Sequence, residues 1–265
     1  MDLSRIRDDL EKFAEALSRE EYLTRAGLKD ESRAAAIRER YASLASRSLF
    51  DEVWGKARAA SGNEEARGLR FLAEFLGTNW IEYQVRESSD RLTTAEAAQT
   101  IAVDGERIPL RSAEVRIKNE ADRSRRAALE SCRLSAVAEL NGLRREILER
   151  SHAETQRLGF AGYTSFCQEL SGIDLALLRE LTRPILSRTQ DMYRDLLAWY
   201  LRRRLGVEPK EARRHALARL FRAPEFDGSL PAGTLREAAE APLRRMGIDP
   251  NAAGRIRVDD EPRPK

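Results

Sequence analysis

The chain of 265 residues has few of the side chains that usually build a metal or catalytic site. Only two histidines occur, His152 and His215, and they lie far apart in the sequence. Zinc hydrolases that bind the metal on a helix use His-Glu-x-x-His, in which two imidazoles lie one turn apart and the glutamate activates water. Here the position four residues after His152 is Gln156, and His215 has no second histidine within helical reach. The sequence therefore lacks a histidine-based zinc motif.

Other catalytic signatures are also absent from the sequence. No glycine-rich phosphate loop and no Gly-x-Ser-x-Gly elbow occur. The two cysteines, Cys132 and Cys167, lie in amphipathic segments where a small apolar residue would serve equally well, so we predict buried free thiols rather than a disulfide. Nothing in their neighbourhood predicts an activated thiolate. Enzyme classes that depend on these motifs are therefore disfavoured for this chain alone.

The chain also lacks a long hydrophobic run. No apolar stretch approaches the roughly 20 residues that a membrane-spanning helix needs. The first 20 residues are charged and amphipathic, unlike a secretory signal. We therefore expect a cytoplasmic protein that has no membrane partner.

Charge is abundant but nearly balanced. Charged residues make up 34% of the chain, and 47 lysines and arginines face 44 aspartates and glutamates, which leaves a net charge of +3. Arginine pairs such as Arg125-Arg126 and Arg213-Arg214 alternate with glutamates at helical spacing. Nucleic acid favours a surface of one sign. The pattern predicts ion-paired helix surfaces and no nucleic-acid partner.

Helical periodicity dominates the sequence, and we predict a mainly α fold, an elongated multi-helix bundle. The segment 119–158 is predicted to be the longest helix. Within the helix predicted over 174–205, Pro184 should kink or divide the chain, and the aromatic residues Tyr193, Trp199 and Tyr200 should pack in the core. The other predicted helices cover residues 2–26, a segment that starts near 30, and residues 48–60, 64–88, 209–221 and 234–246.

Several residues mark helix starts. Three pairs of the capping-box type predict them: Ser61 with Glu64, Thr93 with Glu96, and Thr234 with Glu237. Asp174 is expected to cap the helix that follows it.

Two segments carry β signals. Asp104-Gly105 separates two β-prone runs, which predicts a small hairpin near residues 100–110, with Pro109 at an edge or a strand end. The alternation Arg255-Ile256-Arg257-Val258 predicts a terminal strand near 255–259. We divide the chain into an N-terminal helical lobe, 1–118, which ends in the hairpin, and a long-helix lobe, 119–265.

Four segments in the second lobe resemble, in their order, the helical N-terminal region of zinc oligopeptidases related to oligoendopeptidase F and thimet oligopeptidase. Residues 1–118 match this family mainly by being helical. The segments that carry the resemblance are Asn-Glu-Ala-Asp-Arg-Ser-Arg-Arg at 119–126, Leu-Gly-Phe-Ala-Gly-Tyr at 158–163, Arg-His-Ala-Leu-Ala-Arg-Leu-Phe at 214–221, and residues 243–265.

The resemblance implies a role as a groove wall. In the family, the zinc-binding helix follows a strand of the kind predicted at 255–259, so the zinc, its ligands and the catalytic glutamate would belong to a catalytic half that this chain lacks. The parent would be a zinc metallopeptidase that hydrolyses short peptides, and this chain alone would be inactive and hold no cofactor. The residues nearest to the groove would be Asp259, Glu261, Arg263 and Lys265.

Two alternatives remain open at this level. The chain can be a stand-alone α-helical scaffold or interaction module that has no catalytic half. It can also be an unrelated helical binding protein, including one that binds RNA through its arginines. If the catalytic half is missing, we expect one face to expose a contiguous apolar patch or to be covered by a second copy in a homodimer.

Overall fold

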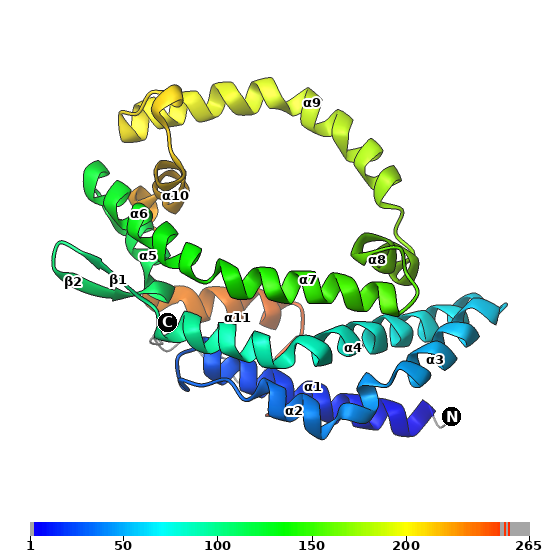
Figure 1. Ribbon diagram of the computed structural model, residues 1–265. Helices are drawn as coiled ribbons and strands as arrows, with labels where there is room; N and C mark the ends of the chain where they lie inside the picture. The colour runs from blue at the N-terminus through cyan, green and yellow to red at the C-terminus, as the bar shows by residue number, and fades with distance from the viewer. Residues whose placement is uncertain (1–2, 250–251, 253, 255–265) are drawn as a thin grey trace.

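The computed structural model describes residues 3–249 together with Ala252 and Gly254. This part of the chain contains eleven α-helices and one two-stranded antiparallel sheet (Figure 1). The predicted fold, mainly α with one small hairpin, is therefore confirmed. The strand predicted at 255–259 lies outside the described residues, and the division at residue 118 stays a prediction.

The elements follow one another along the chain with short connections. The α-helices are α1 (Leu3–Arg25), α2 (Ala34–Arg40), α3 (Arg47–Ala59), α4 (Asn63–Ala98), α5 (Leu110–Asn119), α6 (Arg123–Glu139), α7 (Asn141–Arg157), α8 (Tyr163–Ser171), α9 (Leu175–Tyr200), α10 (Arg214–Arg222) and α11 (Leu235–Arg245). The strands are β1 (Thr100–Val103) and β2 (Glu106–Pro109). Shorter helical turns are η1 (Ala42–Ala45), η2 (Leu201–Leu205), η3 (Pro209–Glu211), η4 (Pro224–Phe226) and η5 (Ala232–Thr234).

The helix α4 is the central element, with 36 residues. It packs against α2, α3, α7 and α8, and Figure 1 shows α1 and α2 on one side of it and α7 on another. The main apolar core forms where α3, α4 and α8 meet. Its most buried members include Phe50, Leu76 and Leu170.

A second, smaller core joins the hairpin to α5 and α6 through Ile101, Ile108 and Ile117. The hairpin turn has Asp104 at φ 52° and Gly105 at φ 80°, the left-handed pair that a two-residue turn requires. Pro109 is the last residue of β2, opposite Thr100, where its missing amide interrupts no ladder. The predicted hairpin and the predicted place of its proline are therefore confirmed.

The helix predicted over 119–158 is wrong in its continuity. Two helices, α6 and α7, share this segment and meet at Leu140. Asn141-Gly142 follows this point, and both residue types are weak helix formers. Arg144 Nη1 donates to the carbonyl of Val137 at 2.9 Å, which satisfies an acceptor near the end of α6. The apolar stripe runs on across the break, so periodicity alone could not reveal it.

The helix start predicted at Thr93 is wrong, and the start predicted at Thr234 is right but lacks its capping bond. Thr93 lies inside α4, which continues to Ala98 rather than ending near Ser88, and its hydroxyl donates to the carbonyl of Ser89. Thr234 precedes α11 but makes no capping bond, because its hydroxyl donates to the carbonyl of Pro231. For α4 the capping position belongs to Gly62 rather than Ser61. Local hydroxyl bonds thus compete with the capping box.

The helix α9 departs most from expectation. It runs unbroken through Pro184 and buries no residue along its 26 positions. Tyr193 and Trp199 are 54% and 50% exposed, so the prediction that they pack in the core is wrong. Tyr200, predicted with them, is half-buried and belongs to neither core. Figure 1 shows α9 bowed and lying away from α4 and α7. The amphipathic pattern is present, but no described element covers its apolar face.

We expect Gly77→Ala to lower the free energy of unfolding by about 1–3 kcal/mol, because an added methyl group would overpack the main core. A Cβ at Gly77 would lie 2.8 Å from a ring carbon of Phe166 and 3.0 Å from one of Phe50. Chemical denaturation measures the change. Gly68→Ala, in an open position on the same helix, should stabilise the protein by up to about 1 kcal/mol. Equal effects of the two substitutions would contradict the close approach at Gly77.

Candidate functional site

The four groove-proximal residues expected from the resemblance, Asp259, Glu261, Arg263 and Lys265, lie outside the described residues. The structure therefore neither brings them together nor separates them. Within the described part of the chain, three regions gather chemically distinctive side chains. They are a polar pocket between α1, α2 and α4, an arginine network where α5 meets α6 and α10, and the exposed apolar face of α9.

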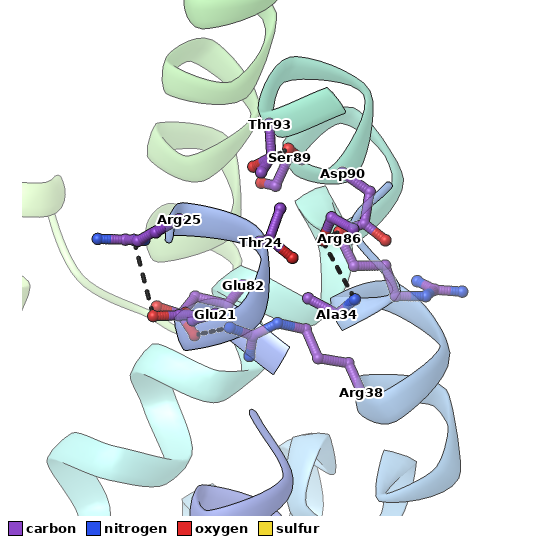
Figure 2. A pocket seen from close by; sticks show the side chains of 11 residues that line it. Glu21, Thr24, Arg25, Ala34, Arg38, Glu82, Arg86, Ser89, Asp90 and Thr93 are labelled. Atoms are coloured by element: carbon purple, nitrogen blue, oxygen red, sulfur yellow. Dashed lines mark hydrogen bonds and ion pairs between the residues drawn. The ribbon is translucent and has the colours of Figure 1, made fainter. Parts of the chain in front are cut away.

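The polar pocket has a volume of about 180 Å³ (Figure 2). Cationic, anionic and hydroxyl groups all line it, and most of the charged groups bind one another. Arg38 Nη2 lies 2.6 Å from Glu82 Oε2, and its Nη1 donates to Asn79 Oδ1 at 3.1 Å. The lining residues are Glu21, Thr24, Arg25, Ser32, Ala34, Arg38, Glu82, Arg86, Ser89, Asp90 and Thr93.

Asp90 has a structural role in this pocket. Its Oδ1 accepts a hydrogen bond from Ser32 Oγ at 2.6 Å, and its Oδ2 accepts one from the backbone amide of Ala35 at 2.8 Å. The residue at the capping position of α2, Arg33, makes no side-chain cap. A carboxylate from α4 thus satisfies an amide at the start of α2, a task normally done by the adjacent residue. This pocket's polar groups fix α2 in place.

Glu20 of α1 also binds a backbone amide at the start of α2. Its Oε1 accepts hydrogen bonds from Lys29 Nζ and from the backbone amide of Arg33, the latter at 2.6 Å. Burial alone would raise the pKa of Glu20, but these two hydrogen bonds outweigh it and leave the pKa below its ordinary value of 4.5. The ionised carboxylate therefore stabilises the fold above that pH, and the contribution is lost as the pH falls further.

We expect Asp90→Ala to lower the free energy of unfolding by about 0.5–2 kcal/mol, the usual cost of losing a helix cap. The local effect should be larger, with faster hydrogen exchange at the amide of Ala35 because its acceptor is gone. Asp30→Ala is the matched control, since Asp30 is an exposed carboxylate in the loop that leads to α2. If Ala35 exchanges equally fast in both variants, Asp90 does not cap α2.

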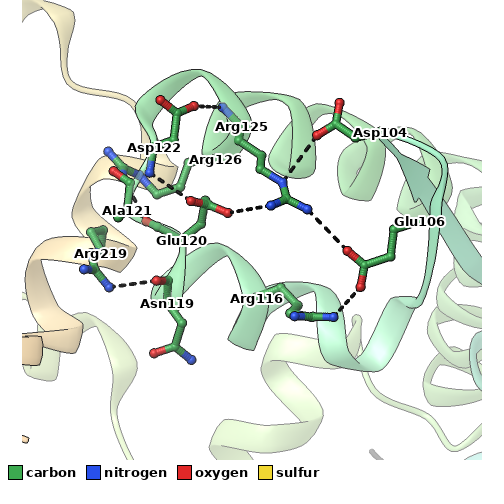
Figure 3. A network of polar contacts seen from close by, with 10 residues as sticks. All are labelled: Asp104, Glu106, Arg116, Asn119, Glu120, Ala121, Asp122, Arg125, Arg126 and Arg219. Carbon is green, nitrogen blue, oxygen red and sulfur yellow. Dashed lines mark hydrogen bonds and ion pairs between the residues drawn. The ribbon is translucent and has the colours of Figure 1, made fainter.

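The arginine network closes the end of α5 (Figure 3). Arg126 of α6 donates through Nη1 to the carbonyls of Glu120 and Ala121 at 2.9 and 2.7 Å. Arg219 of α10 donates to the carbonyls of Lys118 and Asn119 at 3.1 and 3.0 Å. Cations are favoured at a helix C-terminus, where carbonyls lack partners. Two guanidinium groups from different helices therefore terminate α5.

Arg125 joins the hairpin to the same junction. Its guanidinium lies 3.3 Å from Asp104, 3.3 Å from Glu106 and 3.5 Å from Glu120, one carboxylate for each side of the group. A cavity of about 300 Å³ beside it is lined by both signs of charge, and its other arginine, Arg116, binds Glu106. Both guanidinium groups already bind carboxylates, so this cavity offers an anion little attraction.

His215 is buried beside this network. Its Nδ1 has no hydrogen-bond partner, and neither has Nε of the buried Arg126. Burial lowers the pKa of His215, and the charge of Arg126 lowers it further, against an opposing effect of Glu130. Arg123 and Arg213 also lower it. Burial and the cations around it thus both favour the neutral form of this imidazole.

We expect the contact of α10 with α5 and α6 to weaken as the pH falls below 6.5, the ordinary pKa of histidine. A histidine whose folded pKa is depressed favours folding above its unfolded pKa, and this contribution declines when the unfolded state gains a proton. Hydrogen exchange of α10 amides between pH 7.5 and 5.5, in the range where histidine ordinarily titrates, measures the effect. His215→Leu should remove the dependence, whereas His152→Ala, at an exposed position, should retain it.

The apolar face of α9 is strongly exposed. Ten large apolar side chains on this helix are between 39% and 68% exposed. At its C-terminal end, a cavity of about 460 Å³ lies between α9, α10 and η4 and has a mostly apolar lining that includes Leu196, Tyr200 and Phe221. Its charged member, Arg204, binds Glu225. This region can hold apolar surface but offers few groups to orient a polar ligand.

The thiols and histidines form no catalytic arrangement in the described residues. Cys132 and Cys167 are free, as predicted, but half-buried rather than buried. Burial raises the pKa of Cys167, which disfavours a reactive thiolate. His152 contacts the ring of Tyr163 at 5.9 Å between ring centres. The described part of the chain has no group of three or more metal-binding side chains. It also has no helix of the length and apolarity that crossing a bilayer demands.

Comparisons with protein-family models, with curated proteins and with solved structures each find no match. Evidence on function therefore comes from the residues and from their arrangement.

Proposed function

We propose that this chain supplies the helical, non-catalytic wall of a zinc-dependent oligopeptidase-like protein that hydrolyses short peptides. Zinc, its ligands and the catalytic glutamate would come from polypeptide other than residues 1–265. The observation that supports this proposal best is the position of the segment 158–163, one of those on which the family resemblance rests. It forms a packed corner between α7 and α8, and the resemblance is to a corner of the same residue types.

The corner is specified by its own residues. Gly159 has φ +94°, a left-handed conformation that suits glycine at a helix end. Leu158 and Phe160, on either side of it, are buried in the main core. The ring of Phe160 makes an edge-on contact with Phe166 at 5.1 Å between centres, and Tyr163 begins α8. Apolar packing on both sides of Gly159 therefore fixes the turn between α7 and α8.

A second segment of the resemblance also falls at an element boundary. Asp122, within the segment 119–126, caps α6 by accepting a hydrogen bond from the amide of Arg125 at 2.6 Å. Two helices of 17 residues each, α6 and α7, follow it. A wall of packed helices suits a groove that admits short peptides and excludes folded proteins, with Asp259, Glu261, Arg263 and Lys265 proposed as its nearest residues on this chain.

The test is a peptidase assay on the 265-residue chain with short fluorogenic peptides, with and without zinc. We expect background rates in both, because the proposal assigns the activated water to other polypeptide. The coding sequence after Lys265 should encode His-Glu-x-x-His, and the longer protein should show zinc-dependent turnover that is lost when the first histidine of that motif is changed. Zinc-dependent turnover by the 265 residues alone would contradict the proposal.

A second candidate function is a stand-alone helical scaffold or interaction module. The uncovered apolar face of α9 favours it, because such a face is typical of a protein-binding surface. A stop codon directly after Lys265, with no peptidase partner encoded nearby, would favour the scaffold over the peptidase wall.

A further inference from the structure

The exposed face of α9 has an internal symmetry that indicates its partner. Six large apolar side chains recur at three, four or seven residues and form one stripe along the helix. All six are 47% to 62% exposed. The residues of the stripe are Leu178, Leu181, Ile185, Met192, Leu196 and Trp199.

The spacing of the stripe residues is symmetric about a midpoint. Its members fall into pairs that lie at equal distances from the midpoint between residues 188 and 189. The pairs are Leu178 with Trp199, Leu181 with Leu196, and Ile185 with Met192. When two identical helices pack antiparallel about a two-fold axis at that midpoint, each member of a pair faces the other member on the second helix. An unrelated partner would require no such relation.

The charges beside the stripe bring both signs together in the same register. Antiparallel packing about a two-fold axis places like edges of the two helices side by side. Arg188 and Asp191 lie on the same edge of α9 and are both exposed. With a rise of about 1.5 Å per residue, Arg188 of each copy lies about 3 Å along the axis from Asp191 of the other and about 1.5 Å from the other Arg188. Asp191, which also binds Arg194 of its own copy at 3.2 Å, therefore offsets the repulsion between the two arginines.

The helix offers a long surface for such a contact. It has 26 residues and is about 39 Å long, given that rise. The six side chains of the stripe are each about half exposed and follow this length, so pairing along the helix would cover all of them. A standard stable interface takes about 800 Å² from each partner, which the stripe reaches only together with the atoms that flank it.

We propose that α9 is a homodimer interface, in which two copies of this chain pair antiparallel about a two-fold axis between residues 188 and 189. The proposal does not rest on the proposed function. If the chain is monomeric, the dimer proposal fails and the proposed peptidase function is unaffected. If the chain alone shows zinc-dependent turnover, the proposed function fails and the dimer proposal is unaffected.

Sedimentation equilibrium of the 265-residue chain tests association. We expect a dimer at micromolar concentrations. The double variant Ile185→Glu/Met192→Glu should weaken it at least about a hundredfold, because like charges then face each other twice across the axis. Both positions are exposed in the single chain, so circular dichroism should show an unchanged fold. Ser187→Glu/Gln190→Glu adds the same charge on the opposite face and should leave the dimer intact.

Charge reversal tests the edge contacts. Arg188→Glu should weaken the dimer about tenfold by placing two acidic groups together, and Arg188→Glu/Asp191→Arg should restore it.

Disulfide cross-linking tests the register, in a background that carries Cys132→Ser and Cys167→Ser. Thr189→Cys lies next to the axis and should form a covalent dimer, whereas Ser187→Cys should not. A mixture of Leu178→Cys and Trp199→Cys chains should cross-link to each other, and neither should cross-link to itself. A monomer at all concentrations up to about 100 µM, a dimer that both glutamates leave unchanged, or self-cross-linking of Leu178→Cys would overturn the proposal.

Discussion

The architecture depends on the close approach of two aromatic rings to one backbone position. Phe50 of α3 and Phe166 of α8 both lie where a side chain at Gly77 of α4 would be. The helix α8 lies far from α3 and α4 in the sequence, so the contact holds α3 and α8 against the same position of α4. The position of α8 in turn determines where α9 begins, because Gly172 ends α8 in a left-handed conformation and Asp174 caps α9 directly afterwards.

Around this core, four charged side chains help to terminate helices. Asp90 and Glu20 bind amides at the start of α2, and Arg126 and Arg219 bind carbonyls at or just after the end of α5. In each case the side chain comes from a helix other than the one it terminates. The free ends of helices need partners, and long charged side chains can reach them across an interface.

Features determined by neighbouring residues could be predicted from the sequence. The Asp104-Gly105 turn and the cap at Asp174 each depend on a few adjacent positions, and the structure confirms both. The break at Leu140 could not be predicted, because its apolar stripe continues on both sides.

The role of Asp90 depends on a helix 55 residues away, which no local pattern encodes. Glu20 did offer a signal. It lies on the same face of α1 as the buried Phe13 and Thr24, and a carboxylate on a buried face requires a partner.

The helix α9 shows how much an amphipathic pattern can predict. Its period indicates that one face is apolar, and from this we predicted that Tyr193 and Trp199 pack in a core. That inference assumed a covering element within the chain, and the described residues provide none. Period alone cannot name the partner, because any apolar surface would satisfy it.

The symmetry of the stripe carries more information than its period. In an interface between two identical helices, a change at one position is felt at the position related to it by the two-fold axis, so both halves of the helix are constrained together. With an unrelated partner, each half of α9 would face a different surface, and its apolar positions could vary independently. Matched spacing on either side of Arg188 and Thr189 is therefore what self-association requires, whereas an unrelated partner would not require it.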